Sequence, residues 1–304
     1  MARMTKRKKR QTVVVFGGSG FLGSHVADVL SEAGFEVRIF DQKPSPYLRE
    51  GQCMIVGDIL DRDKVMKAAT GCDYVYNFAG IADLDEAGIK PLDTARLNVI
   101  GNMNIMDAAL AAKAKRFMYA STIYVYSEKG GFYRCSKQAA ELYIEEYRRR
   151  FGLDFTILRY STLYGTRADE RNSIYRYLKA ALTNGAILCS GSGEEVRDYV
   201  HVRDAARLSV DILDEKYRNQ HIIVSGNHPI KYKDMMMMIR EILGNNVKID
   251  FSHKTNSALY DYTPYSFAPK IGHKLTHHLY LDMGQGLLEC LHEIDGRTAR
   301  KASR

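Results

Sequence analysis

Short apolar runs alternate with segments of helical periodicity along the first half of this 304-residue chain. The runs are rich in β-branched and aromatic residues, and each is followed by a segment able to form a helix or a crossover. They lie at Thr12 to Phe16, Glu36 to Phe40, Cys53 to Val56, Tyr74 to Phe78, Arg116 to Ala120 and Phe155 to Leu158. Strands connected in this way run parallel, and helices cover both faces of a parallel sheet. The pattern therefore predicts an α/β fold with a doubly wound parallel sheet.

Beyond Gly165 this alternation gives way to segments whose apolar spacing is mainly helical. They span Asn172 to Thr183, Asp204 to Glu215, Tyr232 to Leu243 and Gln285 to Ile294, with the apolar run His221 to Val224 among them. We interpret this part of the chain as a smaller second lobe from which the chain returns once to the sheet.

Composition argues for a soluble, cytoplasmic protein. Hydrophobic residues make up 45% of the chain, yet no apolar run approaches the roughly 20 residues that span a bilayer. The N-terminus lacks the apolar stretch of a secretion signal. The five cysteines are scattered without a C-x-x-C pair, so we expect reduced thiols rather than disulfides or structural zinc. No carboxylate completes a metal site with the neighbouring His273, His277 and His278, and we expect no metal.

The positive charge of the chain is concentrated at its two ends. Residues 1–10 carry six basic groups and no acid, and residues 297–304 carry four more. Subtracting these ten charges from the net charge of +8 leaves about −2 for the rest of the chain. We therefore expect two basic, disordered tails, and neither a nucleic acid nor a membrane as partner.

A glycine-rich turn, Gly17-Gly18-Ser19-Gly20-Phe21-Leu22-Gly23, connects the first predicted strand to the first predicted helix. Gly17 permits the tight turn, Gly20 lets the backbone approach a pyrophosphate, and Gly23 lets the helix pack closely on the strand. Asp41 ends the second strand, where a carboxylate accepts hydrogen bonds from a ribose 2′-hydroxyl and repels a 2′-phosphate. This context predicts a Rossmann-type domain that binds NAD rather than NADP. The alternatives are a glycine turn without ligand and a solvated aspartate.

Thr122, Tyr133 and Lys137 follow the fifth predicted strand within one short span. If a helix begins near Phe132, Tyr133 and Lys137 share one face, one turn apart. A free tyrosine, with a pKa near 10, is a poor base at neutral pH. A nearby ammonium and an oxidised nicotinamide would both lower that pKa, so that Tyr133 becomes a general base while Thr122 holds the substrate oxygen. The alternative is that Tyr133 and Lys137 are exposed helix residues.

Several motifs in one order resemble those of the extended short-chain dehydrogenase/reductases, specifically the nucleotide-sugar epimerases and dehydratases. Besides the glycine turn they are Asp58-Ile59, Ala79-Gly80, Asn98, Ser121-Thr122, Tyr133-Arg134-Cys135-Ser136-Lys137 and Arg197-Asp198-Tyr199-Val200-His201-Val202. The likeness covers roughly residues 11–296. It implies a Rossmann domain with NAD, a C-terminal lobe for a nucleotide-sugar substrate, and a homodimer formed by a four-helix bundle with Leu92 to Ala112 and Ser136 to Arg150.

The resemblance also implies a role for individual residues. Thr122, Tyr133 and Lys137 match the catalytic triad, and Lys137 would also hold the nicotinamide ribose. The implied cofactor-binding residues are Gly17, Gly20, Phe21, Leu22, Asp41, Asp58, Ile59, Ala79, Gly80, Asn98, Tyr133, Lys137 and Tyr160. Thr162, Asn172 and Arg197 match residues that bind the sugar nucleotide, although Arg197 could instead pair with a neighbouring acid. The corresponding domains are 11–166 plus 198–226 for NAD, 167–197 plus 227–296 for the substrate, and the tails 1–10 and 297–304.

Departures from the family pattern narrow the chemistry. The 4,6-dehydratases carry an Asp-Glu pair directly after the threonine and the related decarboxylases also carry an acid there, whereas this chain has Ile123-Tyr124. Thr162 replaces a usual asparagine, and only ten residues separate Thr122 from Tyr133. The missing acid favours an NAD-dependent C4 epimerase that oxidises its sugar transiently to a 4-keto form, whereas the other two departures indicate a more open pocket and an unusual sugar. The alternatives are a keto-sugar-nucleotide reductase or dehydrogenase, a dehydratase, and a non-enzymatic protein whose NAD occupancy regulates a partner.

Overall fold

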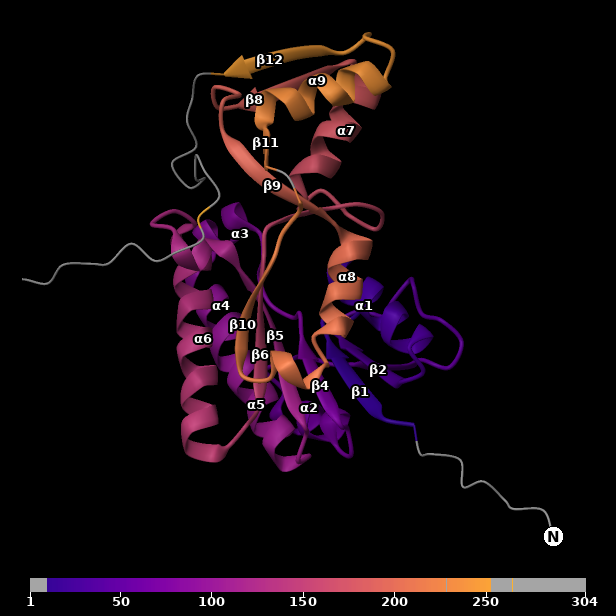
Figure 1. The fold of residues 1–304 in the computed structure, drawn as a ribbon, viewed down its shortest axis with the longest axis vertical. Helices are drawn as coiled ribbons and strands as arrows, with labels where there is room; N and C mark the ends of the chain where they lie inside the picture. The colour runs from indigo at the N-terminus through magenta and orange to yellow at the C-terminus, as the bar shows by residue number, and fades with distance from the viewer. Residues whose placement is uncertain (1–9, 228, 253–263, 265–304) are drawn as a thin grey trace, which may run out of the picture. The chain divides into compact units, whose positions relative to one another are not determined.

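The computed structural model describes residues 10–227, 229–252 and 264 (Figure 1). Residues 1–9 of the first basic tail, the whole second tail, the three neighbouring histidines and the predicted helix Gln285 to Ile294 lie outside the described residues.

A seven-stranded sheet with parallel pairing throughout forms the larger part of the fold, and its strand order is β3-β2-β1-β4-β5-β6-β10. The strands are β1 (Thr12–Phe16), β2 (Glu36–Asp41), β3 (Cys53–Val56), β4 (Tyr74–Asn77), β5 (Arg116–Thr122), β6 (Phe155–Tyr160) and β10 (Gln220–Val224). All six predicted strands and the apolar run His221 to Val224 belong to it, which confirms the predicted fold class. The order reverses between β1 and β4, and ligands bind open α/β sheets in the crevice at such a reversal.

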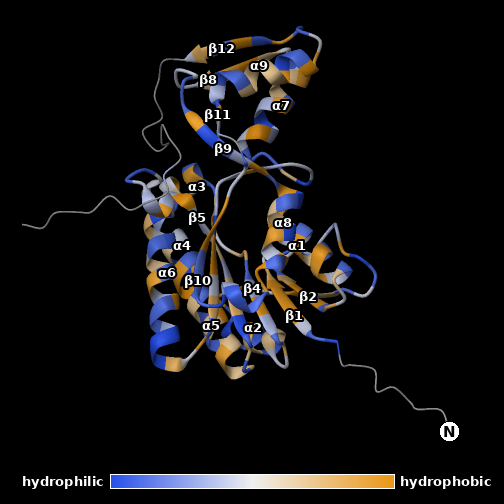
Figure 2. Cartoon of the chain, in the orientation of Figure 1, coloured by the Kyte–Doolittle hydropathy of each residue, from blue (hydrophilic) through white to orange (hydrophobic). Residues whose placement is uncertain are grey.

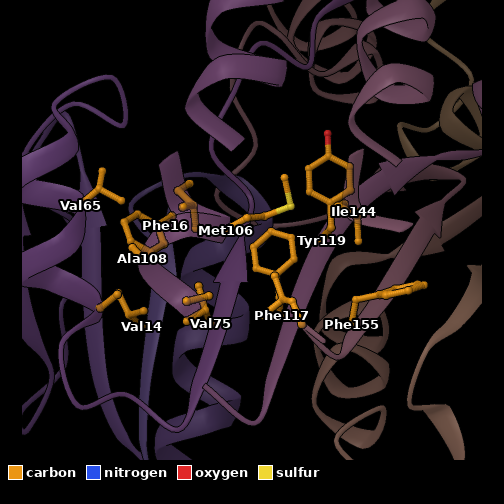
Figure 3. Packing of buried hydrophobic residues seen from close by; sticks show 14 of the residues in the cluster. Val14, Phe16, Val65, Val75, Met106, Ala108, Phe117, Tyr119, Ile144 and Phe155 are labelled. Atoms are coloured by element: carbon orange, nitrogen blue, oxygen red, sulfur yellow. The ribbon is translucent and has the colours of Figure 1, made fainter. Parts of the chain in front are cut away.

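Helices cover both faces of this sheet. Residues alternate along each strand, so Val14 and Phe16 pack against α2, α5 and α6, while Val13 and Val15 pack against α1 and α8. Figure 3 shows the first of these clusters, and Figure 2 shows hydrophobic residues along β1 and β2 with mostly hydrophilic ones on α6. The helices on the sheet are α1 (Phe21–Glu32), α2 (Arg62–Ala69), α5 (Asn102–Ala111), α6 (Gly131–Phe151) and α8 (Val202–Asp211). The short helices α3 (Leu84–Ile89) and α4 (Pro91–Ala95) contact α6.

Local sequence explains where several of these helices begin and end. The Asp61 side chain caps α2 by accepting a hydrogen bond from the Lys64 backbone N–H at 3.1 Å. Gly152, with a φ of 75°, ends α6 in the left-handed conformation. The segment predicted as one helix from Leu92 to Ala112 is interrupted by a π-helical turn, η1 (Arg96–Gly101). Such turns are frequent at functional sites.

A separate group of elements has its own core. It contains the sheet β11-β9-β7, the pair β12-β8 and two helices. The elements are β7 (Thr162–Tyr164), α7 (Ser173–Asn184), β8 (Ala186–Ser190), β9 (Val196–His201), β11 (Pro229–Lys231), α9 (Tyr232–Ile242) and β12 (Lys248–Ser252). The sequence pattern predicted only the two helices of this group and none of its strands, because these strands are short and pair with distant segments. The division into an NAD domain and a substrate lobe stays a prediction.

The helix predicted over Asp204 to Glu215 is displaced toward the N-terminus. It runs over Val202–Asp211 because the His201 side chain caps its first turn, accepting a hydrogen bond from the Arg203 N–H at 3.4 Å. A short 3₁₀ turn, η3 (Glu215–Tyr217), follows it and is capped by Asp214. The prediction therefore located the helix but misplaced both of its ends.

Candidate active site

The glycine turn has the shape that a bound pyrophosphate requires. Gly17 has a φ of +77°, and its N–H donates to the Phe40 carbonyl at 2.8 Å. A Cβ on Gly23 would lie 2.2 Å from the Gly17 carbonyl oxygen, so only glycine lets α1 approach the turn this closely. A Cβ on Gly20 would meet only that oxygen, at 3.3 Å. The outer side of Gly20 is therefore open to a ligand at the N-terminus of α1.

Asp41 lies at the end of β2, directly beside this turn. Its carboxylate accepts hydrogen bonds from the Ser19 N–H at 3.1 Å and from the Lys43 N–H at 3.3 Å. A carboxylate has about four acceptor positions, so two remain for ribose hydroxyls. The residues present thus fit the adenosine ribose and pyrophosphate of NAD.

A pocket of about 240 Å³ opens near the carboxyl ends of β2, β3 and β4. It is lined by Gln42, Asp58, Leu60, Ile81, Glu86, Lys90, Asp93, Arg96 and Leu97. The structure separates two residues that the sequence assigned to one motif. Asp58 faces this pocket and accepts a hydrogen bond from the Leu60 N–H at 2.9 Å, whereas Ile59 is buried under Gly101.

Asn98, expected to contact the cofactor, has both amide N–H groups engaged inside the protein. Its Nδ2 donates to the Ile81 carbonyl and to Ser136 Oγ, each at 2.9 Å, and its Oδ1 accepts from the Ile81 N–H at 2.8 Å. A Cβ on Gly80 would lie 2.3 Å from that Oδ1. The side chain therefore holds the Ala79-Gly80 turn against α6, and the role that the geometry supports is positioning.

The structure brings Thr122, Tyr133 and Lys137 together in a buried position. Thr122 ends β5, Tyr133 lies in the first turn of α6 and Lys137 lies one turn further on. The side chains of Thr122 and Tyr133 share a hydrogen bond. Lys137 Nζ donates to the Ala120 carbonyl at 2.7 Å and lies 4.6 Å from the centroid of the Tyr119 ring. The alternative of an exposed tyrosine and lysine is wrong, because both residues are less than 9% exposed.

The proton affinities of these groups follow from their burial. Desolvation raises the pKa of Tyr133 to about 12, against the opposing hydrogen bond with Thr122. Desolvation also lowers the pKa of Lys137 to about 8, and the Glu141 carboxylate opposes that change. In the chain by itself the pKa of Tyr133 is therefore raised and not lowered as predicted, because desolvation outweighs the groups that favour the phenolate. The hydrogen bond with Thr122 favours the phenolate, and the positive nicotinamide of a bound cofactor would favour it further.

A buried ionic network beneath the triad was missed by the sequence argument. Glu141, on α6, accepts hydrogen bonds from Arg159 of β6 and from Ser121, the residue before Thr122. The spacing was visible in the sequence, because Glu141 continues the interval of four from Tyr133 through Lys137. A charged Arg159 inside an apolar strand was a second signal.

Of the expected substrate residues, Asn172 and Arg197 have local partners in the structure. Asn172 caps α7 by accepting from the Tyr175 N–H at 3.1 Å, and its amide donates to the Leu163 carbonyl at 2.8 Å. The Arg197 guanidinium lies 5.7 Å from the centroid of the Tyr232 ring. Thr162 begins β7.

Tyr160, expected to bind the cofactor, ends β6 with a buried side chain. Its hydroxyl hydrogen bonds to Ser209 Oγ of α8 at 2.6 Å. The phenol therefore joins strand and helix inside the core.

An open parallel sheet with a glycine turn at the first helix and a buried Thr-Tyr-Lys group defines a dinucleotide-dependent protein of the short-chain dehydrogenase type. A sequence profile of the NAD dependent epimerase/dehydratase family matches residues 13–226, and the chain belongs to this family. NAD is its cofactor.

Curated relatives in this family differ in the reaction that they catalyse. A UDP-N-acetyl-alpha-D-glucosaminuronate decarboxylase of Bacillus cytotoxicus is 28% identical over 80% of this chain and 83% of its own length. A putative UDP-glucose 4-epimerase of Methanocaldococcus jannaschii is 26% identical over 76% and 82%. Among solved structures, a UDP-N-acetylglucosamine 4-epimerase from Methanobrevibacter ruminantium in complex with UDP-N-acetylmuramic acid has a TM-score of 0.78 at 24% identity, covering 86% of this chain and 91% of that one. The last likeness supports the fold.

No helix in the described part of the chain is long and apolar enough to cross a membrane. Among the same residues, no group of three or more His, Cys, Asp or Glu side chains could hold a metal ion.

Proposed function

We propose that the protein is an NAD-dependent nucleotide-sugar epimerase that inverts C4 through a transient 4-keto sugar. The observation that carries this proposal is the buried group of Thr122, Tyr133 and Lys137 without a carboxylate at position 123 or 124. Bound NAD would accept a hydride from the sugar carbon and return it. Tyr133 would remove the hydroxyl proton and give it back, and Thr122 would hold the oxygen throughout.

The residues after Thr122 argue against dehydration. Removing water from a sugar requires a second acid and base to move protons at neighbouring carbons. Ile123 is fully buried hydrocarbon, and Tyr124 packs its ring edge-on against Tyr133, with centroids 6.3 Å apart. A phenol is a weak acid at neutral pH. Epimerisation needs no group beyond the triad and the cofactor.

We further propose that Thr162, Asn172 and Arg197 contact the nucleotide sugar and that Arg197 pairs with its diphosphate, as a guanidinium can. By resemblance, the protein would work as a cytoplasmic homodimer that packs α5 and α6 against their symmetry mates. Leu142 and Tyr143 of α6 are 63% and 44% exposed, which is consistent with such an interface.

The test is NMR in heavy water of the purified full-length protein with a panel of UDP-, GDP-, CDP- and dTDP-sugars and no added cofactor. Inversion at C4 without deuterium uptake supports the epimerase and identifies its substrate. Deuterium in the sugar ring means enolisation and contradicts the simple C4 mechanism. Turnover only with stoichiometric NADH indicates the reductase.

Tyr133→Phe is the matched variant for this assay. Loss of the phenolic proton acceptor should lower turnover by roughly 10²–10⁴-fold while sparing NAD affinity. Tyr175→Phe, which changes an exposed tyrosine of α7 outside the triad and the proposed interface, should leave turnover unchanged. A regulatory NAD-binding protein would be indifferent to both changes.

A further inference from the structure

Four side chains at intervals of four residues lie along one face of α6: Tyr133, Lys137, Glu141 and Glu145. The first two belong to the candidate active site. The third, Glu141, has a side chain that is only 6% exposed. A carboxylate is costly to bury, so its partners show what it does.

Glu141 connects α6 to two strands of the large sheet. Its Oε1 accepts hydrogen bonds from Ser121 Oγ at 2.5 Å and from Arg159 Nε at 3.1 Å, and its Oε2 accepts from Arg159 Nη2 at 2.6 Å. The paired contact fixes the guanidinium in its plane. Ser121 directly precedes Thr122, so the carboxylate holds β5 at the residue next to the catalytic hydroxyl.

Arg159 extends this network to the other side of Thr122. Its Nη1 donates to the Tyr126 hydroxyl, and its guanidinium lies 4.7 Å from the centroid of that ring. Tyr126 ends the short 3₁₀ turn η2 (Ile123–Tyr126) that follows Thr122. The network therefore holds Ser121, before Thr122, and Tyr126, after it, and connects both to the helix that carries Tyr133 and Lys137.

We propose that Glu141 is a positioning residue of the active site: together with Arg159 it fixes the backbone around Thr122 relative to Tyr133 and Lys137. Its effect on turnover rests on the proposed function, whereas its effect on Lys137 does not.

The same carboxylate acts on the charge of Lys137. The groups that face the ammonium are Tyr133 and Glu141 of α6, the Tyr119 ring of β5 and, behind Glu141, Arg159 of β6. Glu141 is the negative charge that opposes desolvation there. Without it, the Arg159 charge is no longer neutralised, and Lys137 loses its proton at lower pH.

The first experiment needs no substrate. A ¹³Cε-lysine NMR titration measures the pH midpoint at which Lys137 loses its proton. The Lys137 resonance is assigned by its loss in Lys137→Met. Glu141→Gln, which keeps the shape of the side chain, should lower that midpoint by about one pH unit. Glu145→Gln removes a charge one turn further along the same face and should leave it unchanged. An unshifted midpoint in Glu141→Gln overturns the electrostatic part, whether or not the protein is an epimerase.

The second experiment measures turnover on the substrate found by the panel. Ser121→Ala removes only the contact to β5, keeps the ion pair and should fold normally. Because a shift of about 1 Å in catalytic geometry can cost roughly 10²-fold, we expect kcat to fall about 10–100-fold with KM little changed. The Lys137 midpoint should stay in place. In Glu141→Gln the alkaline limb of the kcat profile should also move to lower pH. Normal kcat in Ser121→Ala and in folded Glu141→Gln overturns the positioning role.

Discussion

An added methyl group should affect stability at Gly23 but not at Gly20. In Gly23→Ala the Cβ would lie 2.2 Å from the Gly17 carbonyl oxygen, where ordinary contact begins at 3.4 Å, so α1 must move by about 1.2 Å. Overpacking of this kind costs about 1–3 kcal/mol. In Gly20→Ala the Cβ meets that oxygen at 3.3 Å, and the φ of −78° suits any residue. Unfolding free energy should then change by less than about 1 kcal/mol.

Binding of NAD should distinguish the two variants further. The methyl on Gly20 occupies the face that a pyrophosphate would approach, and each lost charge-assisted hydrogen bond is worth about 1.5–3 kcal/mol. That loss corresponds to roughly 10–150-fold weaker binding. We therefore expect Gly20→Ala to keep its stability and lose NAD, and Gly23→Ala to lose both.

The assay is urea unfolding without nucleotide together with calorimetric titration of NAD into nucleotide-free protein. Gly88→Ala is the control, because nothing lies within 4 Å of its added Cβ. It should bind NAD normally and be more stable by about 0.5–1 kcal/mol. Wild-type NAD affinity in Gly20→Ala, or wild-type stability in Gly23→Ala, would contradict the prediction.

Two further predictions concern buried charges. Desolvation lowers the pKa of Lys137 from 10.5 to about 8, so the unfolded chain binds more protons between these values and stability rises with pH across that window. The unfolding free energy of Lys137→Met should exceed that of wild type by about 1–3 kcal/mol at pH 7, and the difference should shrink by pH 10. Urea unfolding of both proteins at each pH measures it, and a difference that does not change with pH would contradict the prediction. The Asp28 carboxylate pairs with Arg49 at 2.8 Å and with Arg167 at 2.7 Å. Asp28→Asn should therefore lower the unfolding free energy by about 1–3 kcal/mol and speed amide hydrogen exchange in residues 42–52. Unchanged exchange there would show that Asp28 does not hold this segment.

The large sheet was predictable because its strands are apolar on both faces and need no knowledge of their partners. The ends of two strands were not. β5 continues to Thr122 and β6 to Tyr160, through Ser121 and Arg159. Polar residues are tolerated in these positions only because Glu141, from a different element, satisfies them. Hydrophobic periodicity cannot detect such a partner.

In the candidate site, too, the features set by local sequence were predictable and those set by distant segments were not. The pairing of Tyr133 with Lys137 was predictable, since an interval of four on one helix fixes it locally. The direction of Lys137 toward the Ala120 carbonyl and the raised pKa of Tyr133 were not, because both depend on burial by distant segments. The short strands β8 and β12 were missed for a similar reason, as they pair across about sixty residues.

Because Tyr133, Lys137 and Glu141 lie on one face of α6, their relative positions are fixed by a single rigid helix. Deleting a single residue between Tyr133 and Lys137 would turn the two apart by about 100° and shift them by about 1.5 Å, so that no later substitution could realign them separately. Conversely, any rotation of the helix about its axis moves Tyr133, Lys137 and Glu141 together. Ala140 and Ile144 of α6 pack in the hydrophobic core and thereby oppose such a rotation. Because Glu141 also contacts Ser121 of β5 and Arg159 of β6, an engineered α6 would need these two strand residues to be kept with it.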